Sequence, residues 1–402
     1  MNVLKLIPLE LNLLGTETVS TANSLGLYLA IGVGAGLLVV SALLYRALKR
    51  QVQASDTPAS KSPTGRTPSS QLDHVEPVSD TDHLARMMLE NGRYALLLRP
   101  QIAGNLSSNI LEQAMTMLDE SMTIVPDGDL LIGLDSKSEN QEDISASGQL
   151  VSVEGLYLDR YQVTNEQYQA FVEGGGYEEM ALWDPEIWPA VLDFVDINGN
   201  AGPRYWRDGK FNPGEANLPV VGVCWYEAAA YARWVGKRLP TDPEWVKAGS
   251  WPVPLPDANP IQRKYPWGNS MNQANANLWG CGPGTLVPVD QFEGGVSVGG
   301  AYQLIGNAWE WTSSRFGAWQ SPDKQLVLDN SIRSLRGGAF DTYFDHQAIC
   351  DHQSGDNAVA RKHNIGFRCA VSYCDIIPDP TINLPEETTQ SVEEPTVAMV
   401  GE

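Results

Sequence analysis

All twelve tryptophans of this 402-residue chain lie between Trp183 and Trp319, and the two ends of the chain are poor in aromatic residues. Aromatic rings supply much of the apolar surface that a core buries. The length alone would suit two or three domains. The tryptophans instead predict one main globular domain, from about Met122 to Cys374, which is long enough to bury most of its apolar surface.

The chain is strongly acidic, with a net charge of −22. Binding DNA or RNA through phosphates requires clustered lysine and arginine. The composition therefore argues against a nucleic-acid partner and indicates a solvated acidic surface that keeps the protein soluble.

An uncharged apolar stretch runs from Leu25 to Tyr45, after an N-terminal tail of residues 1–24. At 1.5 Å per residue, a helix of this length spans about 30 Å, the thickness of a bilayer's hydrocarbon core. The stretch predicts a transmembrane helix. A cleaved signal peptide is the alternative, which the apolar length and the single preceding basic residue, Lys5, disfavour.

Three basic residues, Arg46, Lys49 and Arg50, follow this stretch immediately. Positive charge favours the cytoplasmic side of a membrane. We therefore expect a single-pass membrane protein with its large domain in the cytoplasm. The five cysteines leave at least one thiol unpaired in a monomer, which a reducing compartment tolerates.

Two segments have the composition of flexible chain. Residues 46–81 are rich in serine, threonine and proline, and residues 375–402 are acidic without a basic residue. Neither can bury enough apolar surface to offset its chain entropy, so we expect a linker and a disordered tail.

Residues 82–121 are predicted to form a helical hairpin. Apolar residues three and four apart indicate one helix over Asp82–Arg99 and another over Leu106–Glu120, separated by Pro100 and Gly104. The hairpin would pack against the domain or bind a partner.

Local signals predict several elements of the domain. Alternation around a Pro-Asp-Gly turn indicates a β-hairpin over Met122–Leu134. A strand over Val151–Val163 leads to Thr164, which would cap a helix. The stretch Trp225–Ala248 reads as two helices, the second capped by Thr241.

Three motifs follow in order: GNAWEWT at Gly306–Thr312, RGGAF at Arg336–Phe340 and GFRCA at Gly366–Ala370. Together with the helical pair at Trp225–Ala248, they resemble the formylglycine-generating enzyme and sulfatase-modifying-factor family. The resemblance implies an α+β fold, a variant of the C-type-lectin fold, over residues 122–374.

The resemblance also implies where oxidase chemistry would take place. The family's oxidases carry a copper(I)-binding cysteine pair after the RGG segment. The corresponding positions hold Thr342 and Gln347, and a neighbouring serine is replaced by Ala339. Copper(I) requires soft thiolate ligands. We therefore expect neither copper nor formylglycine-generating activity by that route.

Calcium is the cofactor that the resemblance implies, bound by backbone and side-chain oxygens. The ligands would be Gly306, Ala308, Glu310 and Gln303, the last of which replaces an asparagine. A second family site would begin at Asn277 and Leu278. Its aspartate-bearing loop is replaced by the short loop Gly280–Gly284, so we expect that site to be lost.

The strand-like spacing of Trp309 and Trp311 directs both rings to one side and Glu310 to the other. We expect both rings in the core. Glu310 would then serve a loop backbone, a basic side chain or a cation.

The remaining motif residues read as architectural. Gly337 and Gly338 permit backbone conformations closed to other residues. Arg336 is expected to pair with a buried acid such as Glu310, and Arg368 to be a buried ion-pair donor on the final strand.

A cluster of metal-ligating residue types lies close to the RGG segment. It contains Asp345, His346, Cys350, Asp351 and His352, with His363 nearby. Imidazoles and carboxylates bind zinc or iron, and three would make an open catalytic site. Because the spacing matches no standard motif, a surface or groove-lining role is the alternative.

Three functions remain open. The first is a membrane-tethered module, without oxidase activity, that binds a protein or peptide. The second is an enzyme, either a formylglycine-type oxidase or a non-haem iron relative that uses the histidines. The third is a structural subunit of a membrane complex, held through Leu25–Tyr45 and the hairpin. The missing cysteine pair favours the first.

Overall fold

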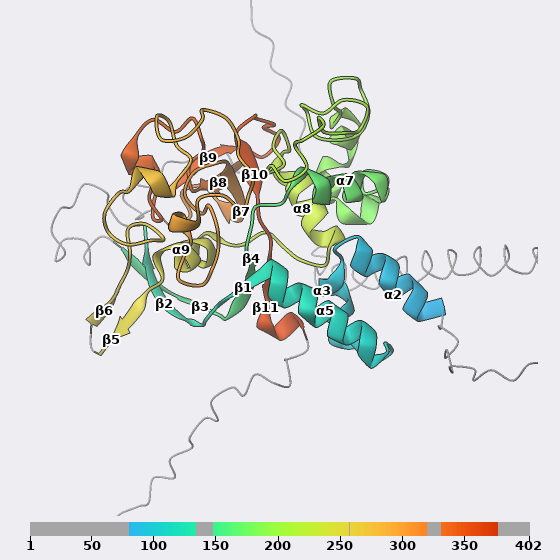
Figure 1. Ribbon diagram of the computed structural model, residues 1–402, viewed down its shortest axis with the longest axis horizontal. Coiled ribbons are helices and arrows are strands. Elements are labelled where there is room, and N and C mark those ends of the chain that lie inside the picture. The colour runs from blue at the N-terminus through green and yellow to red at the C-terminus, as the bar shows by residue number, and fades with distance from the viewer. Residues whose placement is uncertain (1–79, 134–147, 257, 320–330, 377–402) are drawn as a thin grey trace, which may run out of the picture. The chain divides into compact units, whose positions relative to one another are not determined.

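The computed structural model describes residues 80–133, 148–256, 258–319 and 331–376, which form a mixed α+β fold (Figure 1). The predicted transmembrane helix at Leu25–Tyr45 lies outside the described residues, as do most of the predicted linker and tail. Every helix within the described ranges is too short or too polar to cross a bilayer.

The helical segment contains four helices where the sequence predicted two. They are α2 (Asp80–Glu90), α3 (Tyr94–Leu97), α4 (Pro100–Ala103) and α5 (Ser108–Ser121). The prediction of one helix over Asp82–Arg99 is wrong. The chain turns at Gly92, whose φ of 70° is left-handed, and Pro100 begins a new helix.

The helices α2, α3 and α5 share a core with a three-stranded sheet (Figure 1). The buried residues Ile110, Ala114 and Leu118 of α5 pack in one cluster with Tyr157 and Val371 of that sheet. The hairpin is therefore part of the packed domain.

The three-stranded sheet has the order β1-β4-β11, and all of its pairs are antiparallel. Its strands are β1 (Met122–Val125), β4 (Leu156–Asp159) and β11 (Ala370–Ser372), while β2 (Gly128–Ile132) pairs with β3 (Gln149–Val153). The predicted hairpin over Met122–Leu134 is thus wrong. Both strands exist, but the chain leaves one sheet at Val125 and enters another at Gly128.

The central sheet, which carries the RGG and WEW motifs, has the strand order β10-β7-β8-β9. Its strands are β7 (Trp309–Arg315), β8 (Ile332–Arg336), β9 (Ser354–Asn357) and β10 (Ile365–Phe367). Only the β10–β7 pair of this sheet is parallel. A separate ribbon pairs β5 (Val253–Leu255) with β6 (Ala258–Ile261).

Three helices cover this framework: α7 (Asn165–Glu173), α8 (Trp225–Trp234) and α9 (Asp242–Ser250). The predicted caps at Thr164 and Thr241 are confirmed, since each side chain accepts a backbone N–H in a capping box. Short 3₁₀ helices occur in the connections. They are η1 (Met180–Leu182), η2 (Pro185–Asp193), η3 (Gln273–Asn275), η4 (Glu293–Gly295), η6 (Asp345–Gln347) and η7 (Tyr373–Asp375).

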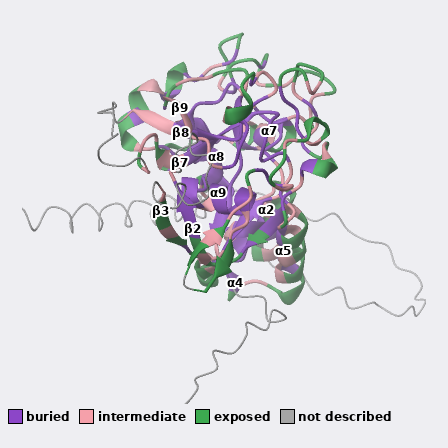
Figure 2. Ribbon diagram, turned by 90° about the vertical axis from the view of Figure 1, so that its left-hand side faces the viewer, coloured by how far each residue is buried: buried purple, intermediate pink, exposed green. Residues whose placement is uncertain are grey.

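Buried residues gather around α8, α9 and the central sheet (Figure 2). Trp309 and Trp311 belong to one core cluster and are 9% and 0% exposed, which confirms the core prediction. Trp245 of α9 belongs to a second cluster, together with Leu304 and Ile305. The segments that carry the motifs therefore lie between two apolar cores.

Partly buried polar contacts tie the helical segment to the end of α8. Lys237 Nζ donates to Asp159 Oδ1 at 2.6 Å and to the Tyr94 hydroxyl at 2.7 Å. Arg93 Nε donates to Trp234 O, and Arg99 Nη2 to Gly236 O, both at 2.9 Å. Cations thus satisfy carbonyls at the helix C-terminus.

We expect Lys237→Met to destabilise the protein by about 3–5 kcal/mol, because it leaves the buried Asp159 carboxylate without its cation. Urea unfolding of the full chain measures the change. The matched control is Lys210→Met, since Lys210 is exposed. Equal midpoints for Lys237→Met and the control would refute the role of this contact.

Candidate functional site

The segment after β8 begins with a turn that only glycine allows. Gly337 and Gly338 have φ values of 94° and 79°. A Cβ on Gly337 would lie 2.5 Å from Leu304 O, too close for any side chain. The predicted backbone role of both glycines is confirmed.

Thr342 and Gln347, at the positions of the family's cysteine pair, take part in local hydrogen bonds. Thr342 is buried, and its Oγ1 accepts from Ala339 N at 2.8 Å. Its carbonyl accepts from Trp279 N at 3.3 Å. Gln347 ends η6, where its backbone N donates to Phe344 O. Neither residue offers the sulfur that copper(I) requires.

Three large aromatic side chains lie exposed beside these positions: Trp279, Tyr343 and Phe344, at 58%, 68% and 55%. We call them the aromatic surface. The ring centroids of Trp279 and Tyr343 are 6.5 Å apart, and those of Tyr343 and Phe344 are 5.2 Å apart. The rings therefore form one contiguous group.

The series of ring contacts continues inward through two histidines. Phe344 lies 5.5 Å from His346, His346 lies 5.9 Å from His352, and His352 lies 6.2 Å from the core residue Trp309, measured between ring centroids. The aromatic surface is thus connected to the central sheet.

The sequence-based predictions did not include the aromatic surface. The sequence offers one signal for it, the adjacency of Tyr343 and Phe344. Neighbouring side chains of an extended segment point to opposite faces, so the two rings cannot both face the core. Contiguous exposed apolar patches on a protein surface are often binding sites.

The predicted histidine and aspartate cluster is divided in the structure. His346 and His352 are neighbours, but His363 pairs with Asp341 at 3.3 Å and its ring contacts Phe340. Across the described ranges, no three His, Cys, Asp or Glu side chains come together as metal ligands.

His352 is held in its neutral form. Burial is the main cause that lowers its pKa to about 4, and the neighbouring Arg336 and His346 act in the same direction. A neutral imidazole at neutral pH can accept a hydrogen bond or bind a metal.

The two motif arginines form separate buried ion pairs. Arg368 binds Glu310 through Nε and Nη2, both at 2.7 Å, which confirms the predicted buried ion pair, but Arg368 follows β10 and does not lie on the final strand. The predicted pairing of Arg336 with Glu310 is wrong, since Arg336 Nη2 lies 2.9 Å from Asp242 Oδ2. Arg368 already holds both oxygens of Glu310, and Asp242 begins the helix α9 beside β8.

The donor set implied for calcium is only partly free to bind the ion: Glu310 and Ala308 already accept hydrogen bonds, whereas Gln303 Oε1 is buried with no hydrogen-bond partner among the described residues. Both Glu310 oxygens accept hydrogen bonds, from Arg368, from Trp245 Nε1 at 2.7 Å and from Gln162 Nε2 at 3.0 Å. Ala308 O accepts from the same Gln162 Nε2. Gly306 and Gln303 lie in the preceding loop, where Gln303 Nε2 donates to Pro288 O and Gln291 O.

At the second calcium site the backbone oxygens are hydrogen-bonded, whereas the side-chain Oδ1 of Asn277 is buried with no hydrogen-bond partner in the described part of the chain. Asn277 O accepts from Asn307 N at 2.9 Å. Leu278 O accepts from Cys281 N and Gly282 N within the loop Gly280–Gly284.

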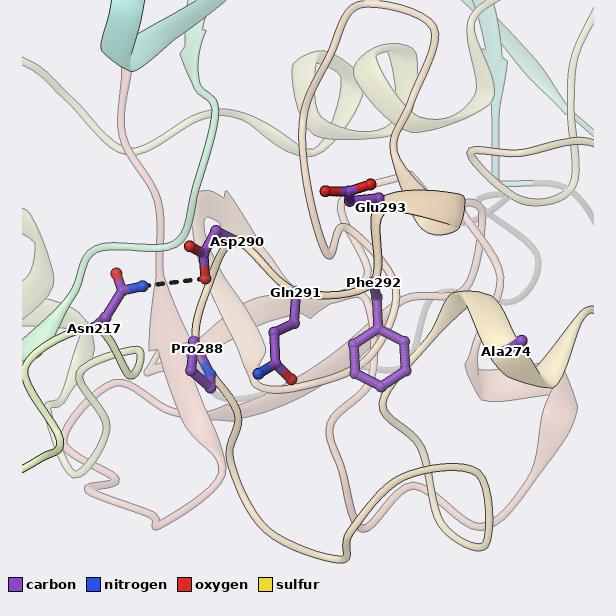
Figure 3. Close-up of a pocket in the computed structure, with 7 residues that line it drawn as sticks. All are labelled: Asn217, Ala274, Pro288, Asp290, Gln291, Phe292 and Glu293. Atoms are coloured by element: carbon purple, nitrogen blue, oxygen red, sulfur yellow. Dashed lines mark hydrogen bonds between the residues drawn. The ribbon is translucent and has the colours of Figure 1, made fainter.

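A wide, open cavity of about 680 Å³ is lined in part by the loop whose Pro288 and Gln291 carbonyls accept hydrogen bonds from Gln303 (Figure 3). Its lining residues are Asn217, Ala274, Pro288, Asp290, Gln291, Phe292 and Glu293. Asn217 Nδ2 donates to Asp290 Oδ1 at 3.1 Å, and Phe292 has a left-handed φ of 63°. Thr342, Gln347 and the histidines are not part of this lining.

Residues 107–373 match the model of the sulfatase-modifying factor enzyme 1-like domain. The chain therefore belongs to this family, which includes proteins named formylglycine-generating enzyme and hercynine oxygenase.

Curated relatives match parts of the chain. Hercynine oxygenase of Mycolicibacterium smegmatis is 32% identical over 54% of this chain and 53% of its own length. Formylglycine-generating enzyme of Mus musculus is 28% identical over 63% of this chain and 75% of its own length. Serine/threonine-protein kinase pkn1 of Chlamydia caviae is 29% identical over 70% of this chain and 43% of its own length. The chain thus spans about half the length of the hercynine oxygenase it matches.

Among solved structures, PvdO from Pseudomonas aeruginosa aligns with a TM-score of 0.43 at 20% identity, covering 62% of this chain and 94% of PvdO. CarF aligns with a TM-score of 0.43 at 16% identity, covering 63% and 98%.

The neutral state of His352 predicts a pH dependence. The pKa of about 4 in the folded protein lies below the value of about 6.5 in the unfolded chain, so the unfolded chain takes up the proton first. Stability that depends on neutral His352 is present above pH 6.5 and is lost as the pH falls toward 4. Between pH 7 and pH 5 we expect a smaller loss of Tm in His352→Gln than in the native protein. Equal losses would contradict this.

Proposed function

We propose that this sulfatase-modifying-factor-like domain is a protein- or peptide-binding module without formylglycine-generating activity. The observation that carries the proposal is the aromatic surface, which lies beside the positions where oxidases of the family hold copper. In this proposal the stretch Leu25–Tyr45 holds the module at a membrane, with the domain in the cytoplasm.

The thiol chemistry argues against an oxidase. Thr342 and Gln347 provide no sulfur, and the nearest cysteine in sequence, Cys350, is 1% exposed. Burial raises the pKa of the Cys350 thiol well above its usual range. Because the thiolate is the metal ligand and the nucleophile, a thiol held in its protonated form serves neither role.

The aromatic surface has the composition of a binding hot spot. Tryptophan and tyrosine are enriched at interfaces and provide much of their binding energy. Contacts between the rings of Trp279, Tyr343 and Phe344 restrict their motion before a partner binds, which lowers the entropy lost on binding. The Trp279 N–Thr342 O hydrogen bond joins the two loops that carry them.

An oxidase or oxygenase is the second candidate. It is supported by the names of the relatives and by the adjacent His346 and His352, of which His352 is neutral and can bind a metal. It requires a ligand beyond these two histidines.

The binding proposal is tested with the full chain, tagged and solubilised in detergent. Trp279→Ala combined with Tyr343→Ala should lower the recovery of native-membrane partners at least tenfold, because each hot-spot residue contributes about 2 kcal/mol or more. Quantitative mass spectrometry of the captured proteins measures the loss.

The matched control is Trp188→Ala, since Trp188 is 46% exposed on η2 and belongs to a different part of the surface. Partners retained by this control and lost by the double variant support the proposal. Equal recovery by all three proteins would contradict it.

A further inference from the structure

The loops before β7 are joined by buried side-chain amides at the positions where the family resemblance implies calcium. Asn277, Asn307 and Gln162 are 0–1% exposed and form a hydrogen-bonded series that ends on Glu310. We infer that this amide series takes the place of the cation, so that these loops fold without calcium. The inference is independent of the proposed binding function.

Backbone groups fix the orientation of the central amide. Val287 N donates to Asn307 Oδ1 at 3.0 Å, and Asn307 Nδ2 donates to Val287 O at 3.1 Å. Because a backbone N–H only donates and a carbonyl only accepts, the oxygen and nitrogen of Asn307 cannot be exchanged.

The orientation of Asn307 determines that of its neighbours. Asn277 Nδ2 donates to Asn307 Oδ1 at 3.1 Å and to Thr285 O at 2.9 Å. Asn307 Nδ2 donates to Gln162 Oε1 at 3.2 Å. The amide nitrogen of Gln162 must therefore point away from Asn307.

That nitrogen lies between two of the implied calcium ligands. Gln162 Nε2 donates to Ala308 O at 2.9 Å and to Glu310 Oε1 at 3.0 Å. Calcium would bind such oxygens at about 2.3–2.6 Å, and the amide nitrogen occupies the space between these two oxygens that the ion would need. One neutral amide thus bridges the oxygens that a cation would bridge.

The charge of Glu310 is also already balanced. Arg368 contacts both carboxylate oxygens, and its side chain is 0% exposed. A calcium ion would bring two further positive charges next to this buried guanidinium, with little solvent to screen the repulsion.

The amide series connects segments that are distant in sequence. It joins the Thr285–Val287 loop and the start of β7 to Gln162, which follows β4. The backbone is close-packed here, since a Cβ on Gly306 would lie 2.6 Å from Asn277 O. The hydrogen bonds supply the cross-links that a bound cation would otherwise supply.

The experiment compares thermal unfolding of the full chain in detergent with EGTA and with added calcium, followed by tryptophan fluorescence. The native Tm should be equal in both. Gln162→Met removes the donor and should lower the Tm by roughly 3–10 °C in both buffers, because Ala308 O and Glu310 each lose a buried hydrogen bond. Gln162→Glu replaces the donor with a carboxylate and should gain a Tm increase of about 5 °C or more with calcium.

A native Tm that rises with calcium would overturn the inference, as would an unchanged Tm in Gln162→Met. A Gln162→Glu protein that folds and gains nothing from calcium would also overturn it. If Gln162→Glu does not fold in either buffer, the native protein and Gln162→Met decide the question.

Discussion

The buried ion pair between Glu310 and Arg368 connects both larger sheets and a helix of the domain. Glu310 lies on β7 and Arg368 follows β10, and the two strands are parallel neighbours. The same carboxylate accepts from Trp245 of α9, and Arg368 Nη1 donates to Asp159 O of β4. Because a buried charge without its partner is strongly destabilising, the two sheets and α9 must keep their relative positions. The pair therefore sets the frame on which the RGG turn is built.

On this frame the chain keeps the family fold, and Thr342 and Gln347 stand where the family resemblance predicts the oxidase cysteines. Gly337 and Gly338 turn the chain beneath Leu304 and direct it to Thr342. There the threonine hydroxyl caps a turn, and the following Tyr343 and Phe344 are exposed. The segment that carries redox chemistry in the family's oxidases here presents apolar rings to solvent. We therefore propose that the family framework carries a binding surface in this protein in place of a metal centre.

Local sequence patterns are sufficient to predict a structural feature that depends only on neighbouring residues. Thr164 and Thr241 are identifiable as helix caps because a cap requires only the next three residues. Contacts between residues that are distant in the sequence cannot be predicted in this way. Arg336 has two buried acids within reach of its strand, and only the packing of α9 selects Asp242 over Glu310. Similarly, the exposure of Trp279 depends on how two distant loops meet, and its hydrophobicity alone would place it in the core.

The central claim is that the domain binds without oxidising a cysteine substrate. The most direct test is to incubate the full chain with copper and oxygen and a sulfatase-type cysteine peptide, and to follow the peptide by mass spectrometry beside an active formylglycine-generating enzyme. We predict that the peptide cysteine stays unchanged with this protein and is converted by the active enzyme. Conversion to formylglycine by the native protein that is lost in Cys350→Ala would contradict this claim.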